Sequence, residues 1–225
     1  MLTKPGIMAR NFDLIVFDWD GTLMDSAGAI VTAILAACQD LSIEPPPLER
    51  ARHIIGLGLH DALRTALPQL DPSEYNSIAE RYRYHYLARD HELELFPGAR
   101  DLVECLHAEG YWLGVATGKS RLGLERVLAS SGLGEFFHAT RCADECFSKP
   151  HPAMLQEIME AIDIPAERAL MIGDTTHDLQ MARNAGVAAV AITHGAHPRT
   201  ELAGEHPLAC VADFAELDEW LRRCG

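Results

Sequence analysis

The sequence has 225 residues, of which 48% are hydrophobic and 23% are charged, and its formal net charge is −14. This composition is that of an ordinary globular protein with enough apolar residues for a substantial core. Nucleic acid is not expected as a partner, because the acidic surface would repel a polyanion and no basic run offsets it.

Targeting and redox signals point to the cytoplasm. No stretch approaches the roughly 20 apolar residues of a membrane span, so no membrane association is expected. Residues 1–10 are interpreted as a frayed lead-in, without the apolar core of a signal peptide. The six cysteines are scattered along the chain, and we interpret them as free thiols in a reducing compartment.

Short apolar runs alternate with helical segments along most of the chain. The helical pattern is clear at 99–110, 152–162 and 177–186, where apolar residues recur with helical spacing. Strands followed by helices indicate βαβ units, in which a parallel sheet is covered on both faces. The fold class predicted is therefore α/β, with a doubly wound parallel sheet. Its predicted strands are residues 13–17, 111–117, 168–174, 188–193 and, more weakly, 208–213.

One long interval breaks this alternation. Residues 26–95 contain no convincing strand, and their apolar residues recur with helical spacing. We therefore predict a catalytic core formed by residues 1–25 and 96–225, with an all-helical domain of residues 26–95 inserted after the first strand. Such an insert would lie above the carboxyl ends of the strands, where open α/β sheets bind ligands.

Polar motifs follow the predicted strands or enter helices at four places. After the first strand, two aspartates stand two residues apart, so their side chains can face one side while Trp19 points to the other. After the second predicted strand, a hydroxyl and a backbone N–H stand ahead of a helix and form a natural anion site. The motifs are DWDGT with Asp18 and Asp20, TGKS with Thr117 and Gly118, SKP with Lys149, and GDTTHD with Asp174 and Asp178.

Collected at one end of a sheet, these groups include four carboxylates and one ammonium. A pair of like charges 4 Å apart costs about 4 kcal/mol at an effective dielectric constant of 20. A cation is needed to hold them together, and all-oxygen ligation favours Mg²⁺. A hard divalent metal beside a lysine, a threonine and a helix N-terminus is suited to hold a phosphoryl group.

In their order, these four motifs resemble those of the haloacid dehalogenase (HAD) superfamily. The helical insert resembles the small helical cap of phosphoglycolate phosphatases in that superfamily. The resemblance implies a Mg²⁺-dependent phosphatase that hydrolyses a small phosphorylated metabolite through an aspartyl-phosphate, with 2-phosphoglycolate as the best guess. A monomer or a homodimer is expected.

The same resemblance implies roles for single residues. Asp18 would be the nucleophile, and Asp20 would be the general acid and then the base. Mg²⁺ would be bound by the side chains of Asp18 and Asp174 and by the backbone carbonyl of Asp20. The remaining motif residues would act on the phosphoryl group or support the site: Thr117, Gly118 and Lys149 would hold the phosphoryl oxygens, and Asp178 would fix Lys149 or a metal-bound water.

Three other activities remain open at this stage. A phosphomutase uses the same motifs but retains the phosphoryl group, and a sensor of a phosphorylated ligand would keep the fold without turnover. A haloacid dehalogenase would need neither Asp20 nor Asp174, so their presence argues against it.

Two segments of the insert are weaker candidates. The segment 54–63, "IIGLGLHDAL", places Gly56 and His60 as possible substrate contacts, although a plain turn between helices fits it equally well. The segment 81–92, "RYRYHYLARDHE", mixes aromatic and basic residues as a nucleic-acid site would. Helical spacing puts its tyrosines on more than one face, which favours packing within the insert.

Overall fold

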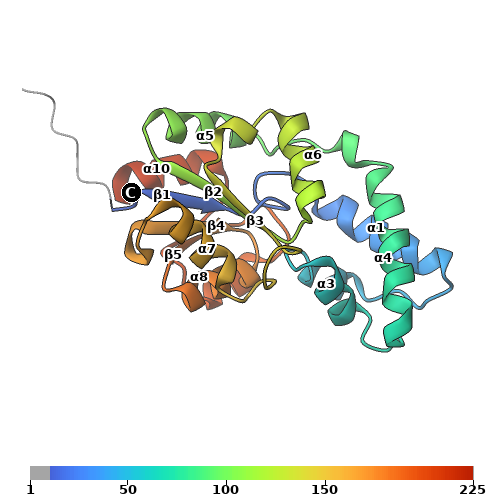
Figure 1. Ribbon diagram of the computed structural model, residues 1–225. Helices are drawn as coiled ribbons and strands as arrows, with labels where there is room; N and C mark the ends of the chain where they lie inside the picture. The colour runs from blue at the N-terminus through green and yellow to red at the C-terminus, as the bar shows by residue number, and fades with distance from the viewer. Residues whose placement is uncertain (1–10, 225) are drawn as a thin grey trace, which may run out of the picture.

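The core of the protein is a six-stranded, fully parallel sheet with the order β3-β2-β1-β4-β5-β6 (Figure 1). The computed structural model describes residues 11–224, so the predicted lead-in of residues 1–10 lies outside the described part. The strands are β1 (Leu14–Phe17), β2 (Trp112–Thr117), β3 (Ala139–Cys142), β4 (Ala169–Gly173), β5 (Ala188–Ile192) and β6 (Ala209–Val211). The predicted α/β fold class with a parallel sheet is confirmed.

Each of the five predicted strands is present, but the sequence analysis did not predict β3. This strand is the edge of the sheet and pairs only with β2. Of its four residues only Cys142 is buried. A half-exposed edge strand needs no apolar run, and the segment "ATRC" therefore carries no strand signal.

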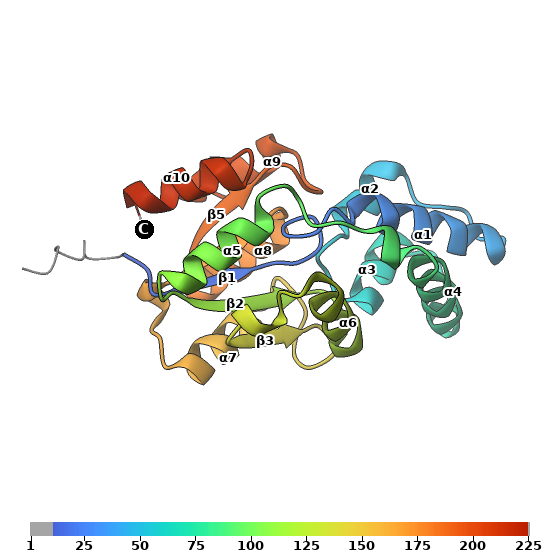
Figure 2. The ribbon, with the colours of Figure 1, turned by 90° about the horizontal axis from the view of Figure 1, so that it is seen from above.

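Alternation along the strands divides the core into two hydrophobic layers. Ile15 and Phe17 of β1 pack in one layer, whereas Leu14 and Val16 pack in the other, because successive side chains point to opposite faces. The first layer is covered by α5 and α10, with α6 beside them, and the second by α7, α8 and α9 (Figure 2). These helices are α5 (Ala99–Ala108), α6 (Arg121–Ser131), α7 (Ala153–Ile162), α8 (Thr176–Ala185), α9 (Arg199–Gly204) and α10 (Phe214–Cys224).

Between β1 and α5 the chain forms a group of helices that lies beyond one end of the sheet (Figures 1 and 2). We call residues 26–95 the cap; its division from the core at these boundaries stays a prediction. The cap has its own apolar cluster, which includes Ile34, Leu63 and Ile78. Its helices are α1 (Ala27–Asp40), α2 (Leu48–His53), α3 (Leu59–Ala66) and α4 (Tyr75–Leu87). None of the described helices is long and apolar enough to cross a membrane.

The chain enters and leaves the cap through two segments that lie side by side. Met24 forms an antiparallel bridge with Leu95. The Asp25 N–H donates to the Glu94 carbonyl (3.0 Å), and the Phe96 N–H donates to the Leu23 carbonyl (2.9 Å). The cap is thus joined to the core by a paired double connection directly after the DWDGT motif.

The order of the strands places a ligand crevice beside β1. This strand pairs with β2 on one side and β4 on the other, so the sequence order of the strands reverses between β1 and β4. In open α/β sheets ligands bind at such a switch point, outside the carboxyl ends of the strands. Asp18 follows β1 and Asp174 follows β4, so both carboxylates lie at the switch point.

Candidate active site

A lysine and two aspartates form the centre of the site. The Lys149 Nζ lies 2.7 Å from Oδ1 of Asp18 and 2.7 Å from Oδ1 of Asp178, and all three side chains are fully buried. The contacts are ion pairs without the alignment of good hydrogen bonds, and the second Asp18 oxygen, Oδ2, has no protein partner. A buried carboxylate oxygen without a donor is costly, so a ligand or cation bound to this oxygen would remove that cost.

Asp174 is held in place from three sides. Its Oδ1 accepts a hydrogen bond from the Thr22 hydroxyl (2.7 Å), and its Oδ2 accepts one from the Ala196 N–H (2.7 Å). A Cβ atom on Gly21 or on Gly195 would lie 2.3 Å or 2.1 Å from Oδ2, so only glycine fits on either side. The loop of residues 193–199, which contains Gly195 and Ala196, therefore orients Asp174.

Asp178 is positioned by the start of α8. Thr175 is the N-cap residue, and its hydroxyl and backbone N–H both donate to Oδ2 of Asp178, at 2.6 and 3.1 Å. In this capping box, Oδ2 of Asp178 accepts both hydrogen bonds, and Oδ1 remains to pair with Lys149. A Cβ on Gly173 would lie 2.3 Å from the Asp178 Cβ, which is why the last residue of β4 is a glycine.

The charges of this cluster are out of balance. Burial raises the pKa of Asp18 well above its usual range, even though Lys149 opposes the shift. Burial, with the charge of Asp178, raises the pKa of Asp174 to about 7. Burial would lower the pKa of Lys149, but Asp178 and Asp18 together raise it, so the ammonium stays charged. One cation thus faces three carboxyl groups, and added positive charge would stabilise the ionised forms.

These carboxylates meet the requirements of a metal centre. One oxygen each of Asp18, Asp174 and Asp178 can be chosen so that all three lie within 4.8 Å of one another. The set is all oxygen, as hard divalent cations prefer. One of its members, Asp18, also has a buried oxygen, Oδ2, without a hydrogen-bond partner. Asp178 is the least available of the three, because its Oδ1 already pairs with the Lys149 ammonium and its Oδ2 accepts two hydrogen bonds from Thr175. Each oxygen of Asp174 accepts only one hydrogen bond from a neutral donor. Asp18 and Asp174 are therefore the side chains best placed to hold a cation.

Asp20 lies at the boundary between the core and the cap. Its Oδ1 accepts a hydrogen bond from the Ser26 hydroxyl (2.6 Å) and forms an ion pair with the Lys119 Nζ (2.9 Å). The same Nζ donates to the Tyr86 hydroxyl of α4 (2.9 Å). The sequence analysis gave Lys119 no role, although it stands two residues after Thr117 in the TGKS motif and so can face the same side of the chain.

Thr117 and Gly118 place the end of β2 against the cap. Thr117 is fully buried, and its hydroxyl accepts the N–H of Lys119 (3.2 Å). A Cβ on Gly118 would lie 2.5 Å from the Leu57 carbonyl oxygen and 2.6 Å from that of Gly56. The segment predicted as a possible substrate contact therefore packs directly on the TGKS loop. Gly56 and His60 both line a cavity beside Asp20.

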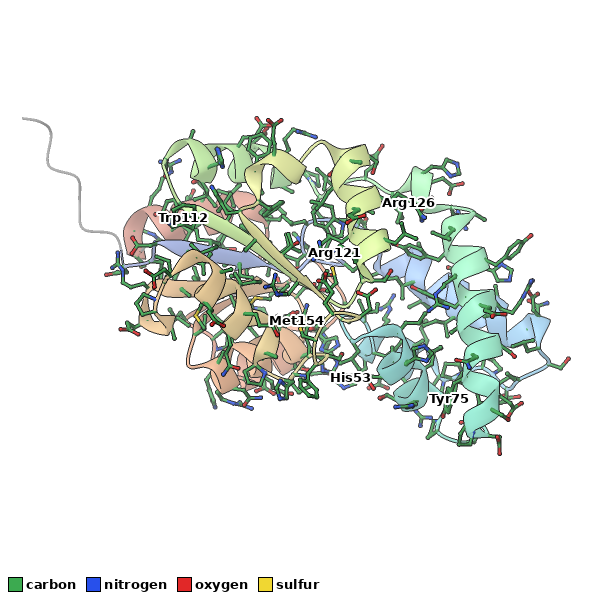
Figure 3. All side chains as sticks on the ribbon, viewed as in Figure 1. His53, Tyr75, Trp112, Arg121, Arg126 and Met154 are labelled. Atoms are coloured by element: carbon green, nitrogen blue, oxygen red, sulfur yellow. The ribbon has the colours of Figure 1, made fainter. Side chains whose placement is uncertain are left out.

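Two histidines of the core form hydrogen bonds with the cap. The Nε2–H groups of His177 and His197 both donate to the carbonyl of His53, at 2.7 and 3.1 Å. His53 lies at the end of α2 and is labelled in Figure 3. Burial lowers the pKa of the His177 and His197 rings, that of His197 to about 4. They are therefore neutral near pH 7. Another contact of the cap is the Gly58 N–H, which donates to the Ser148 hydroxyl (2.8 Å) next to Lys149.

The chain has clear relatives. Residues 15–192 match the family model described as haloacid dehalogenase-like hydrolase. This chain belongs to the haloacid dehalogenase-like hydrolases. It is 35% identical to the "Probable phosphatase IndB" of Dickeya dadantii over 210 residues, which cover 91% of each chain. It is 31% identical to the "Phosphoglycolate phosphatase" of Aliivibrio fischeri over 219 residues, which cover 93% of this chain and 96% of the relative.

Solved structures of the family agree. A predicted phosphoglycolate phosphatase from Haemophilus somnus superposes with a TM-score of 0.82 at 26% identity, covering 94% of this chain and 98% of that one. The predicted family, fold and enzyme class, a HAD-type phosphatase, are confirmed. The roles of single residues remain predictions.

Proposed function

We propose that this chain is a Mg²⁺-dependent phosphatase that hydrolyses a small phosphomonoester through an aspartyl-phosphate on Asp18. The observation that carries the proposal is the buried, unpartnered Oδ2 of Asp18, which lies beside Lys149 in an all-carboxylate cluster. A carboxylate oxygen with no protein donor keeps its lone pairs for a bond to phosphorus. 2-Phosphoglycolate is the best single candidate from the sequence, and the name of the Aliivibrio fischeri relative supports it.

In the first half of the reaction, Asp18 attacks phosphorus and the bond from phosphorus to the ester oxygen breaks. Asp20 gives its proton to that oxygen as the alcohol leaves. In the second half, Asp20 takes a proton from the water that hydrolyses the aspartyl-phosphate. Ser26 and Lys119 orient the carboxyl group through its Oδ1, so that Oδ2 remains for the proton.

The transferred phosphoryl group needs donors for its oxygens. Lys149 supplies an ammonium at Asp18, and Thr117 and the Gly118 N–H supply neutral donors at the end of β2. Such fixed donors stabilise the charge that develops in a near-dissociative transfer. Asp178 positions Lys149 through its Oδ1.

The side chains of Asp18 and Asp174 and the backbone carbonyl of Asp20 would hold Mg²⁺. When bound, the ion neutralises charge between the carboxylate nucleophile and the phosphoryl oxygens. Thr22 and Ala196 keep Asp174 turned toward this position.

Release of inorganic phosphate from a panel of phosphorylated metabolites tests the proposal. We expect turnover in Mg²⁺ that EDTA abolishes and that Mg²⁺ restores. The panel includes 2-phosphoglycolate and sugar phosphates, with the products of each reaction identified. An isomerised sugar phosphate without free phosphate would contradict hydrolysis and indicate a phosphomutase. Binding of these compounds without any turnover would indicate a sensor.

Stability should depend on pH and Mg²⁺ together. The pKa of Asp174 is about 7 in the folded state but ordinary in the unfolded chain. At pH values between these two pKa values, Asp174 is protonated more often in the folded state than in the unfolded chain. Without metal, the contribution of Asp174 to the free energy of unfolding therefore falls as the pH rises from about 4 to about 7. A bound cation offsets that loss, so Mg²⁺ should raise the melting temperature more at about pH 8 than at about pH 5. An equal rise at both values would contradict a metal site at these carboxylates.

A further inference from the structure

A cavity extends from Asp20 into the cap. Its volume is about 440 Å³, within the range of about 300 to 1,000 Å³ that holds ligands of drug-like size. Asp20, Gly118 and Lys119 line its core side, and residues of α1, α3 and α4 line the opposite side. The cavity therefore begins where the proposed leaving oxygen receives its proton and continues away from the phosphoryl position.

Part of the cap wall of this cavity is apolar and aromatic, although His60, Asp61, Arg83 and Asp90 of the cap also line the cavity. Ile30, Ile34 and Ile54 line it and are at most 8% exposed. Tyr82 and Tyr86 stand one turn apart on α4, with their rings stacked at 5.7 Å and an angle of 22° between their planes. These five side chains form a surface that gains free energy by burying hydrocarbon against it.

The cations of the lining are already engaged or face solvent. Lys119 is shared between Asp20 and Tyr86. Arg126 of α6 pairs with Asp90 at 3.1 Å, and Figure 3 places it at the margin where α6 faces the cap. Arg83 is exposed. Among the described lining residues, no buried cation is thus left to meet a carboxylate on a substrate.

These observations disfavour a small acid as the leaving group. In 2-phosphoglycolate the carboxylate is attached to the carbon that bears the ester oxygen. It would lie beside Asp20 and compete with it for Lys119. The rest of the cavity would stay unfilled, and its apolar wall would gain no contact.

We propose that the preferred substrate is the phosphate monoester of an uncharged, largely apolar alcohol that fills the cavity between Asp20 and the isoleucine and tyrosine wall. This inference rests on the proposed phosphatase function. It differs in the substrate, because it excludes 2-phosphoglycolate as the preferred one. The reaction is unchanged: the bond from phosphorus to the alcohol oxygen breaks, Asp18 takes the phosphoryl group, and the alcohol leaves with the proton of Asp20. The cap wall contributes by binding the hydrocarbon.

A series of primary alkyl phosphates tests this directly, because their leaving alcohols differ little in acidity. We expect kcat/KM to rise from ethyl to butyl to hexyl phosphate by about tenfold or more in total, because each fully buried methylene can contribute up to about fourfold. Hexyl phosphate should also exceed 2-phosphoglycolate. A flat series, or 2-phosphoglycolate as the best substrate, overturns the inference but leaves the phosphatase proposal intact. No Mg²⁺-dependent release from any compound overturns both.

Two neighbouring residues of α1 provide a matched pair of variants. Ile30 lines the cavity, whereas Val31 does not, and they are 8% and 7% exposed. We expect Ile30→Phe to bring the hexyl-to-ethyl ratio of kcat/KM down toward one, because the added ring occupies the cavity. Val31→Ile should leave that ratio as in the wild type. Equal ratios in both variants would overturn the assignment of the cavity, and the wild-type series alone decides if Ile30→Phe does not fold.

Discussion

Asp18→Asn is expected to lower kcat for phosphate release by about 10⁴-fold or more, since loss of a nucleophile removes the chemical step itself. The amide keeps the size of the side chain but cannot form the acyl phosphate. The measurement is steady-state phosphate release with saturating Mg²⁺, together with trapping of labelled phosphate on the protein. Turnover at the wild-type rate would show that Asp18 is not the nucleophile.

A control variant and a stability measurement separate this effect from unfolding. Asp25 lies in the same loop, but its side chain is exposed, so Asp25→Asn should keep wild-type activity. Asp18→Asn removes a buried carboxylate whose pKa burial has raised, while Lys149 keeps its ion pair with Asp178. The melting temperature in EDTA should therefore stay the same or rise, and a large fall would assign the loss of activity to folding.

Lys149→Met is expected to have the largest effect on stability. The substitution leaves Asp18 and Asp178, both fully buried, without their shared ammonium. Removing one partner of a buried ion pair costs about 3 to 5 kcal/mol. In a protein of this length that cost lowers the melting temperature by about 10 °C. Thermal unfolding in EDTA measures it, and an unchanged melting temperature would contradict the assigned ion pairs.

Two further variants locate the origin of that loss. Adding Asp178→Asn to Lys149→Met removes one of the two buried carboxylates that lost their ion pair. The double variant should therefore recover part of the stability without recovering activity. Lys119→Met is the matched lysine variant. Its partner Asp20 keeps the Ser26 hydrogen bond and is partly hydrated, with both side chains 9% exposed. Its loss of stability should therefore be clearly smaller.

The motif residues were predictable because strand order and polar residues at strand ends are local properties of the sequence. Asp18 directly follows the apolar run of β1, and Asp174 directly follows that of β4. A parallel sheet brings the carboxyl ends of its strands together, so these residues must converge whatever the helices do. The edge strand β3 lacked this signal because only one of its residues is buried.

The remaining site residues depend on contacts that a single sequence does not encode locally. Tyr86 reaches Lys119 only because α4 packs on α1 and turns one face toward the core. Ala196 contributes a backbone N–H. Because almost any residue type can supply a backbone N–H, this donor cannot be recognised from the sequence. Of the tyrosines in segment 81–92, Tyr82 and Tyr86 pack within the cap, and both also line the cavity beside Asp20, whereas Tyr84 is exposed.

The paired connection between core and cap has a mechanical consequence. Asp25 and Phe96 each donate a backbone hydrogen bond across the two crossings, on either side of the bridge at Met24, so the crossings form one short two-stranded strap rather than two independent tethers. Asp20 and Ser26, which share a hydrogen bond, stand at either end of its outgoing strand. A rotation of the cap would twist this strap and turn the Asp20 carboxyl with it. Such a rotation would therefore change access to the cavity and the orientation of Asp20 together.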